Sequence, residues 1–388
     1  GHKITVISGM VNYATGKKAA RYKRKFFLKD DNFYNNVDVV RTHVSESYNT
    51  NFLGRLWAYF SFTFSSTLAG IFKVKDNYDV IIVTSPPLFV GITAIILSFL
   101  KKTPIVFEVR DLWPESAIDT GVLKNKLIIK FAHWFESYIY KKAKLINVLT
   151  PAFSDNLINI KNVPAEKVIV IPNAADFSLA EKIQSDSSFH AVNFKKKLGF
   201  KNNFVITYVG AHGVANHLIQ LIDAAEKLQK TNIIFQLIGS GMEKGFLQKE
   251  VKKRNLSNVI FRDPVPKSEV FKFILASDMG VSVLKNVDTF KTIYSNKTFD
   301  YMSCKKPVFL LIDGVSRELV KKANCGVYVE PENINMIVQK AIEFSKISKE
   351  ELNNLGLNGY NYARNNFERK SLSSKYINLV DNILMNEN

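Results

Sequence analysis

Short apolar runs alternate with helical patterns along nearly the whole chain, and this alternation limits the possible folds more than any other feature. Six runs in the first half are predicted to be strands: Ile4–Ser8, Val37–Thr42, Val80–Thr84, Ile105–Val109, Leu145–Leu149 and Val168–Ile171. Six follow in the second half: Val205–Val209, Ile233–Ile238, Val259–Phe261, Met279–Leu284, Val308–Leu311 and Val327–Val329. Helical patterns such as Lys126–Lys141 and Pro151–Ile160 lie between most of them. Alternating strands and helices favour parallel sheets covered on both faces. We therefore predict an α/β, doubly wound fold in each half.

The length of 388 residues is too great for one ordinary core, so two domains are expected. A polar stretch from Asn173 to Ser188 follows the apolar run before it and is interpreted as an interdomain linker. The predicted domains are residues 1–175, residues 176–365, and a C-terminal helix over 366–388 that packs back on the first domain.

Two uncharged stretches could be mistaken for membrane spans. Leu88–Leu100 is 13 residues long, which is too short, and is expected to be a buried helix. Leu56–Phe72 has 17 residues and is predicted to be a helix packed on a sheet. A spanning segment and a helix lying in the lipid interface remain the alternatives for this second stretch.

The net charge of +18 indicates the partners that the surface attracts. Anionic membrane and phosphorylated substrates both fit such a charge, whereas a lysine-rich solvated surface is the simpler explanation. No helix-turn-helix, zinc or RNA-binding signature accompanies the scattered lysines, so nucleic acid is not an expected partner. The two cysteines, Cys304 and Cys325, have no metal-type neighbours and suit a reducing cytosol.

Charged residues gather where the predicted strand Ile105–Val109 ends. Glu108, Arg110 and Asp111 are followed at once by Trp113 and Pro114. Ligands of open parallel sheets lie beyond the carboxyl ends of the strands, so this cluster is predicted to line a cleft between two sheets. A structural Arg–Asp pair that braces the loop is the alternative.

Glycine turns follow two predicted strands of the second half. Gly239-Ser240-Gly241 comes after Ile233–Ile238, and Gly210 and Gly213 come after Val205–Val209. Such turns expose backbone N–H groups, which can hold a phosphate. A tight strand-to-helix turn explains each of them about as well.

A lysine and an aspartate open the next helical pattern. Lys297 and Asp300 lie one turn apart, on the same helix face. The lysine could neutralise a diphosphate, and the aspartate could accept both hydroxyls of a ribose. A surface ion pair between the two is the alternative.

Taken together, seven motifs carry a resemblance to a known family. In chain order they are SPPLFVG, FEVRDLWPESAIDTGVL, IPNAADF, YVGAHGVANHL, LIGSGMEK, DPVPKSEV and NKTFDYMSCKKPV. The match as a whole runs from about Gly1 to about Arg369. The chain resembles the large retaining family-four glycosyltransferases of GT-B fold, which have two facing Rossmann-like domains. It is most similar to the bacterial branch that builds surface polysaccharides, including transferases of N-acetylfucosamine.

This resemblance implies a nucleotide-sugar donor, with UDP as the nucleotide, held mainly by the C-terminal domain and an acceptor held by the N-terminal one. Carried over by motif, Asp300 binds the ribose and Lys297 approaches the diphosphate. Gly210, Ala211, His212 and Gly213 border the phosphates and sugar. Ser240 and Gly241 lie against the nucleotide, with Val265 and Pro266 near the base. Glu108, Arg110 and Asp111 are the implied catalytic residues.

The resemblance also implies transfer of an N-acetylated amino sugar to a saccharide or lipid-linked acceptor in lipopolysaccharide or capsule synthesis. The chain would act in the cytoplasm, in peripheral contact with the anionic inner face of the plasma membrane. A UDP-N-acetylglucosamine 2-epimerase-like enzyme and an inactive transferase-like binding subunit are the alternatives.

The chain departs from the family in two respects. Thr292 stands where the family has the first acid of Glu-x7-Glu, and Asp300 replaces the second, which leaves the donor sugar open. GHKITVIS matches the second strand of the family, so the first βα unit is expected to be missing, which bears on catalytic competence.

No Asp-x-Asp motif and no zinc-type histidine spacing occur in the chain. We therefore expect metal-independent transfer without a cofactor.

Overall fold

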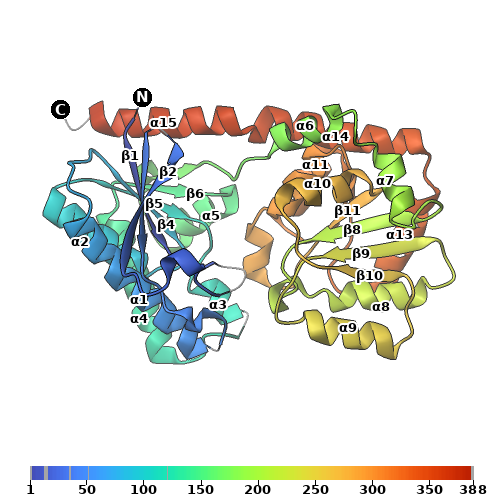
Figure 1. Ribbon diagram of the computed structural model, residues 1–388, viewed down its shortest axis with the longest axis horizontal. Coiled ribbons are helices and arrows are strands. Elements are labelled where there is room, and N and C mark those ends of the chain that lie inside the picture. Colours follow the sequence, from blue (N-terminus) through green and yellow to red (C-terminus); the bar gives the residue numbers. More distant parts are fainter. Residues whose placement is uncertain (1, 13–15, 35, 51, 120, 386–388) are drawn as a thin grey trace. The chain divides into compact units, whose positions relative to one another are not determined.

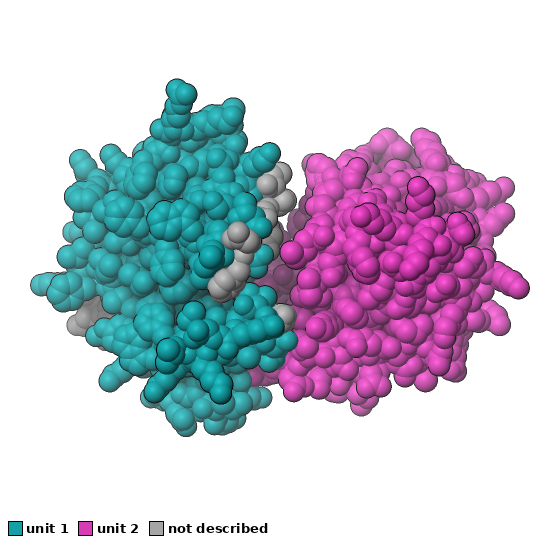
Figure 2. Space-filling view, turned by 90° about the horizontal axis from the view of Figure 1, so that it is seen from below, with its two compact units in different colours: residues 1–148, 153–170, 378–388 teal, residues 149–152, 171–377 magenta. Residues whose placement is uncertain are grey.

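The computed structural model describes residues 2–12, 16–34, 36–50, 52–119 and 121–385. The chain divides into two compact units (Figure 2). Unit 1 contains Gly1–Val148, Phe153–Val170 and Asn378–Asn388, and unit 2 contains Leu149–Ala152 and Ile171–Ile377. Both units combine parallel strands with flanking helices, as the alternating sequence pattern predicts (Figure 1).

Unit 1 has two sheets among its described residues. The smaller sheet has the order β1-β3-β2, and β1 (Ile4–Gly9) runs parallel to β3 (Val37–Thr42), whereas β2 (Phe27–Tyr34) is antiparallel. The larger sheet is parallel and has the order β4-β5-β6-β7. Its strands are β4 (Ile81–Ser85), β5 (Ile105–Val109), β6 (Leu145–Val148) and β7 (Val168–Val170).

The long uncharged stretch of unit 1 forms helix α1 (Phe52–Phe72), which packs against β1, β3 and α2 (Val90–Lys101). The prediction of a helix packed on a sheet is confirmed. Within the part of the chain that the structure describes, no helix is both long enough and apolar enough to cross a bilayer. The other helices are α3 (Glu115–Asp119), α4 (Lys126–Lys142) and α5 (Pro151–Asp155), which continues as a π-helical turn over Asn156–Ile160.

Unit 2 is built on one parallel sheet of six strands in the order β10-β9-β8-β11-β12-β13. The strands are β8 (Phe204–Val209), β9 (Ile233–Ile238), β10 (Val259–Arg262), β11 (Met279–Val283), β12 (Val308–Leu311) and β13 (Gly326–Tyr328). The strand order reverses beside β8, whose neighbours are β9 and β11. A reversal of this kind marks the ligand-binding end of a doubly wound sheet.

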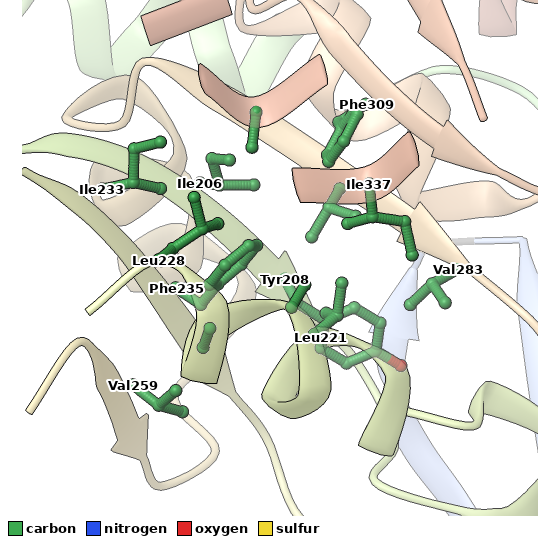
Figure 3. Close-up of a cluster of buried hydrophobic side chains, with 14 of the residues drawn as sticks. Ile206, Tyr208, Leu221, Leu228, Ile233, Phe235, Val259, Val283, Phe309 and Ile337 are labelled. Carbon is green, nitrogen blue, oxygen red and sulfur yellow. The ribbon is translucent and has the colours of Figure 1, made fainter. Parts of the chain in front are cut away.

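Helices cover both faces of the six-stranded sheet. One core contains Phe235, together with Leu221 from α8 (Ile219–Lys227) and Ile337 from α13 (Ile334–Lys346) (Figure 3). Leu247 from α9 (Lys244–Lys253) belongs to the same core. The other core lies under α6, α10, α11, α12 and α14. The remaining bounds are α6 (Phe177–Ser185), α7 (Ala191–Lys197), α10 (Lys267–Leu275), α11 (Asn296–Ser303), α12 (Val315–Ala323) and α14 (Lys349–Phe367).

The C-terminal helix α15 (Arg369–Met385) contributes to both units. It begins within unit 2, and the segment from Asn378 onward belongs to unit 1. Its contacts with unit 1 include His2, whose Nε2 lies 3.8 Å from the carboxylate of Asp381.

The interpretation of Asn173–Ser188 as a linker is wrong over most of its length, because helix α6 occupies Phe177–Ser185. Phe177, Ala180 and Ile183 recur every third residue and are buried in the second core of unit 2. Strand β2 was also missed, since charged residues interrupt its apolar pattern and its pairing with β3 is irregular.

Candidate functional site

Two glycine turns lie back to back at the carboxyl ends of β8 and β9. Gly210 and Gly239 both have a strongly positive φ, of 146° and 147°, which side chains disfavour. A Cβ atom on Gly239 would stand 1.9 Å from the carbonyl oxygen of Gly210. The turns are joined further along, where the His212 backbone N–H donates to the Ser240 carbonyl at 2.9 Å. The structure therefore brings the two predicted turns together at the reversal point of the sheet.

Two more of the predicted glycines differ in what they require. A Cβ atom on Gly241 would collide with the His212 backbone at 2.3 Å, so this position needs glycine for space. Gly213 has an extended φ of −116° and would tolerate a side chain. Ser240 is exposed beside Gly241.

Lys297, in the first turn of α11, reaches the Gly210 turn. Its ammonium lies 5.1 Å from the centre of the Tyr208 ring and 3.4 Å from the side-chain oxygen of Asn216. Burial lowers the pKa of Lys297 to about 8. Among the described residues, no carboxylate forms an ion pair with this lysine. An ammonium group so placed can receive an anion.

Asp300 does not pair with Lys297, which contradicts the alternative of a surface ion pair between these two residues. Its carboxylate lies 3.3 Å from the ammonium of Lys267, which also contacts Asp176 at 3.2 Å. Arg369 lies 3.4 Å from the same Asp176 carboxylate. Burial raises the pKa of Asp300, and Lys267 opposes that shift.

The side chain of His212 is fully buried behind the turn rather than directed toward solvent. It lies beside the rings of Tyr208 and Phe261, and neither ring nitrogen has a hydrogen-bond partner. Burial and the nearby Lys244 lower its pKa to about 4, so the imidazole is neutral. His212 can therefore contact a ligand at the turns through its backbone and not through its side chain.

The other residues predicted near the donor lie around the same sheet. Val265 and Pro266 lie in the loop between β10 and α10, where Pro266 is the residue before the helix and Val265 packs on the second core. Lys291, a further lysine before α11, is paired with Asp288 at 2.7 Å. Thr292 donates its hydroxyl to the Thr289 carbonyl.

In unit 1, the predicted catalytic cluster is held at the end of β5. Glu108 accepts hydrogen bonds from Thr84 at 2.8 Å and from Asn147 at 3.3 Å, both on neighbouring strands. Arg110 is exposed, with its Nε 3.8 Å from the Glu108 carboxylate. Asp111 accepts from Ser116 at 2.7 Å, and burial raises its pKa. The structure thus fixes the orientation of Glu108 and Asp111.

A second charged cluster in unit 1 was not found from the sequence. Glu115, His133 and Glu136 offer ligand atoms within 4.8 Å of one another. The ammonium of Lys161 contacts both glutamates, at 2.9 Å from Glu115 and closer to Glu136. A cationic side chain therefore already neutralises the cluster. Only the spacing of His133 and Glu136 on one helix could have indicated it, since the other members come from separate elements.

Comparisons with known proteins agree with this architecture. Residues 9–174 match the glycosyl transferase 4-like domain, and residues 191–362 match the glycosyl transferases group 1 domain. WcaI of Escherichia coli (strain K12), named as a colanic acid biosynthesis glycosyl transferase, is 24% identical over 264 residues. That match covers 67% of this chain and 63% of the relative.

Solved structures share the fold across nearly the whole chain. Sucrose-phosphate synthase from Thermosynechococcus elongatus has a TM-score of 0.73 at 15% identity, with 99% of this chain and 89% of the other covered. HepE of Anabaena in complex with UDP has a TM-score of 0.69 at 17% identity, with 98% and 100% covered. The predicted GT-B fold of two Rossmann-like units is confirmed.

Proposed function

We propose that this chain transfers a sugar from a UDP-sugar to a saccharide acceptor. The chain has the GT-B fold, and it matches a glycosyl transferase 4-like domain followed by a glycosyl transferases group 1 domain. The observation that carries the proposal is Lys297. This partly buried ammonium has no carboxylate ion-pair partner among the described residues and lies beside the Gly210 turn, at the reversal point of the sheet.

In this proposal, the diphosphate of the donor lies against Lys297 and the backbone of the turns at Gly210, Gly213 and Gly241. Glycine at 210 lets a ligand approach the backbone closely beside Lys297, because no Cβ atom intervenes, and glycine at 241 leaves room for the His212 backbone. The solved complex of the similar HepE with UDP supports UDP as the nucleotide. The base would lie near Val265, Pro266 and Ser240.

Asp300 would bind the ribose hydroxyls after exchanging part of its contact with Lys267. Asp300 lies on the same helix as Lys297, one turn further along, and its carboxylate contacts Lys267. Vicinal hydroxyls are ordinary ligands of a carboxylate in folds of this kind.

For the transfer step, we assign Lys297 and the backbone amides of the turns to the departing UDP. Fixed positive charge at the leaving group stabilises the negative charge that develops in the transition state. We propose a retaining, metal-independent reaction. Glu108, Arg110 and Asp111 would bind and orient the acceptor in unit 1, where Glu108 is held by Thr84 and Asn147.

The donor sugar is proposed to be an N-acetylated amino sugar, and the acceptor a saccharide or lipid-linked oligosaccharide of a surface polysaccharide. The similarity to WcaI, whose name assigns it to colanic acid biosynthesis, supports this pathway class. A lipid-linked acceptor would require contact with an anionic membrane at its cytoplasmic face, which the net charge of +18 favours.

Isothermal titration with UDP tests the donor site directly. Lys297→Ala is expected to weaken UDP binding about 10- to 100-fold, since a charge-assisted hydrogen bond contributes about 1.5–3 kcal/mol. The matched control is Lys291→Ala, which removes an exposed lysine that is paired with Asp288 and should leave the affinity unchanged. Equal affinity of both variants would contradict the assignment.

Product analysis tests the reaction itself. Release of UDP from a UDP-sugar should require an acceptor, and the product should retain the anomeric configuration by NMR. Conversion of UDP-N-acetylglucosamine without an acceptor would instead identify an epimerase-like enzyme.

A further inference from the structure

Helix α4 of unit 1 exposes an apolar stripe to solvent. Leu127, Phe131, Trp134 and Tyr138 lie at intervals of four, three and four residues, which places them on one helix face. Trp134 is 60% exposed and Phe131 is 52% exposed. The opposite face of α4 is buried through Ala132, Phe135 and Ile139. The helix therefore has an apolar face beyond the one that its own core requires.

Helix α1 carries a second stripe with the same spacing. Leu53, Trp57, Phe60 and Phe64 are all exposed, and Trp57 is 63% exposed. The opposite side of α1 packs on β1, β3 and α2.

Aromatic contacts join the two stripes. Phe89, the residue before α2, lies 4.5 Å from the ring of Phe60 and 6.2 Å from that of Phe135. Phe135 is in turn stacked on Phe131 at 6.2 Å. The helices α1 and α4 are drawn in blue and teal in Figure 1. We call the combined exposed surface the aromatic face; its members are Leu53, Trp57, Phe60, Phe64, Leu127, Phe131, Trp134 and Tyr138.

The exposed charges on α4 are all positive. Lys126, Lys130, Lys141 and Lys142 are exposed on the helix. Its only acid, Glu136, is buried, where it accepts a hydrogen bond from Tyr140 and contacts Lys161. The aromatic face is thus accompanied by lysines without an exposed acid on the same helix.

We propose that the aromatic face docks into the headgroup region of an anionic lipid bilayer. Trp and Tyr prefer this region because their rings are apolar and their polar atoms stay hydrated, and lysines attract the anionic headgroups. Charge also disfavours a second copy as the occupant, because the lysines of two copies would face each other. Docking of the aromatic face would give the enzyme access to a lipid-linked acceptor, and this purpose rests on the proposed function. The docking itself does not depend on that function.

Flotation of the full chain with vesicles tests the proposal without nucleotide or acceptor. The chain should bind vesicles of phosphatidylcholine mixed with phosphatidylglycerol at least about tenfold more tightly than pure phosphatidylcholine, and salt should reduce the difference. Equal binding to both vesicle types, or binding to neither, would overturn the proposal.

Matched variants locate the docking surface. Phe131→Ser should weaken binding to the anionic vesicles about fivefold or more, whereas Phe246→Ser on α9, also 52% exposed, should not. The double variant Lys126→Glu/Lys130→Glu should weaken it at least about tenfold, whereas Lys252→Glu/Lys253→Glu changes the net charge equally and should have a smaller effect. Circular dichroism and the melting temperature confirm that each variant is folded.

Two results would assign the aromatic face to something else. If both control variants lose as much vesicle binding as the matched variants on α4, the binding does not depend on the aromatic face, and the proposal is wrong. If the mass in solution rises with concentration and Phe131→Ser abolishes that rise, the occupant is a second copy. Loss of UDP binding would overturn the proposed function but leave vesicle binding unchanged, so the two failures are distinguishable.

Discussion

The side chain of Lys297 carries its charge in a place where burial disfavours that charge. Burial lowers its pKa to about 8, and the ammonium lies beside the amide oxygen of Asn216 and the ring of Tyr208. An unperturbed lysine has a pKa of about 10.4, so the lowered pKa of Lys297 brings its loss of charge into an accessible pH range. In the proposed site, binding of a diphosphate would favour the charged form and would therefore be coupled to the proton on Lys297.

The affinity for UDP is expected to fall about tenfold between pH 7 and pH 9, as the ammonium of Lys297 loses its proton. Any change in the charge of UDP itself affects the parent and an arginine variant alike, so it cancels when the two profiles are compared. Titration calorimetry across the range measures the effect. Lys297→Arg serves as the control, because a guanidinium stays protonated and should give a nearly flat profile. A parent profile as flat as that of the arginine variant would show that Lys297 does not contact the diphosphate.

Some details at this scale could be predicted from the sequence and others could not. The position of Lys297 after a polar segment and before a buried strand is visible in the chain. The partner of Asp300 is not, because Lys267 comes from a different helix and meets it only in the folded unit. The burial of His212 was also hidden, since it depends on Phe261 from another strand.

Among the elements, the two glycine turns are the best-determined part of the candidate site. Their backbones touch, and Gly239 leaves no room for a side chain beside the Gly210 carbonyl. The sequence indicated both turns because glycine at the end of a parallel strand has few other uses. Helix α6 was missed because its polar residues concealed a short buried stripe.

Gly239→Ala is expected to destabilise the protein by about 2–4 kcal/mol and to abolish UDP binding, because a methyl group displaces the neighbouring turn. Gly245→Ala is the control: its Cβ atom meets nothing within 4 Å, and it lies on α9. Since alanine favours helix formation, this variant should be equal to the parent or up to about 1 kcal/mol more stable. Denaturant unfolding of both variants checks the difference. Similar unfolding free energies for the two variants would be evidence against the close contact of the turns.

At the scale of the whole molecule, the chain consists of two units, and unit 2 contains two large hydrophobic cores. The division into two α/β halves was predictable, since strands and helices alternate throughout. The assignment of residues to the units was less so, because Asn378–Asn388 belongs to unit 1 although it follows unit 2 in the sequence.

Differential scanning calorimetry is expected to show two unfolding transitions, because each unit has its own core. UDP at about 100 times its Kd should stabilise the transition of unit 2 by about 2.7 kcal/mol. The transition of unit 1 should shift much less. The control is the Lys297→Ala variant, in which the same UDP concentration should stabilise the transition of unit 2 by only about 0.4–1.4 kcal/mol, given the 10- to 100-fold weaker binding. One transition that shifts as a whole would mean that the units unfold cooperatively.

The division of unit 1 into two sheets has a consequence for how molecules behave at high concentration. The strands β1 and β4 each have one partner strand among the described residues, and exposed Ile4, Val6 and Ile82 lie on them. Open strand edges with apolar side chains favour pairing between chains. A net charge of +18 opposes such pairing by mutual repulsion. Colloidal solubility therefore depends on ionic strength, since added salt screens the force that keeps these edges apart.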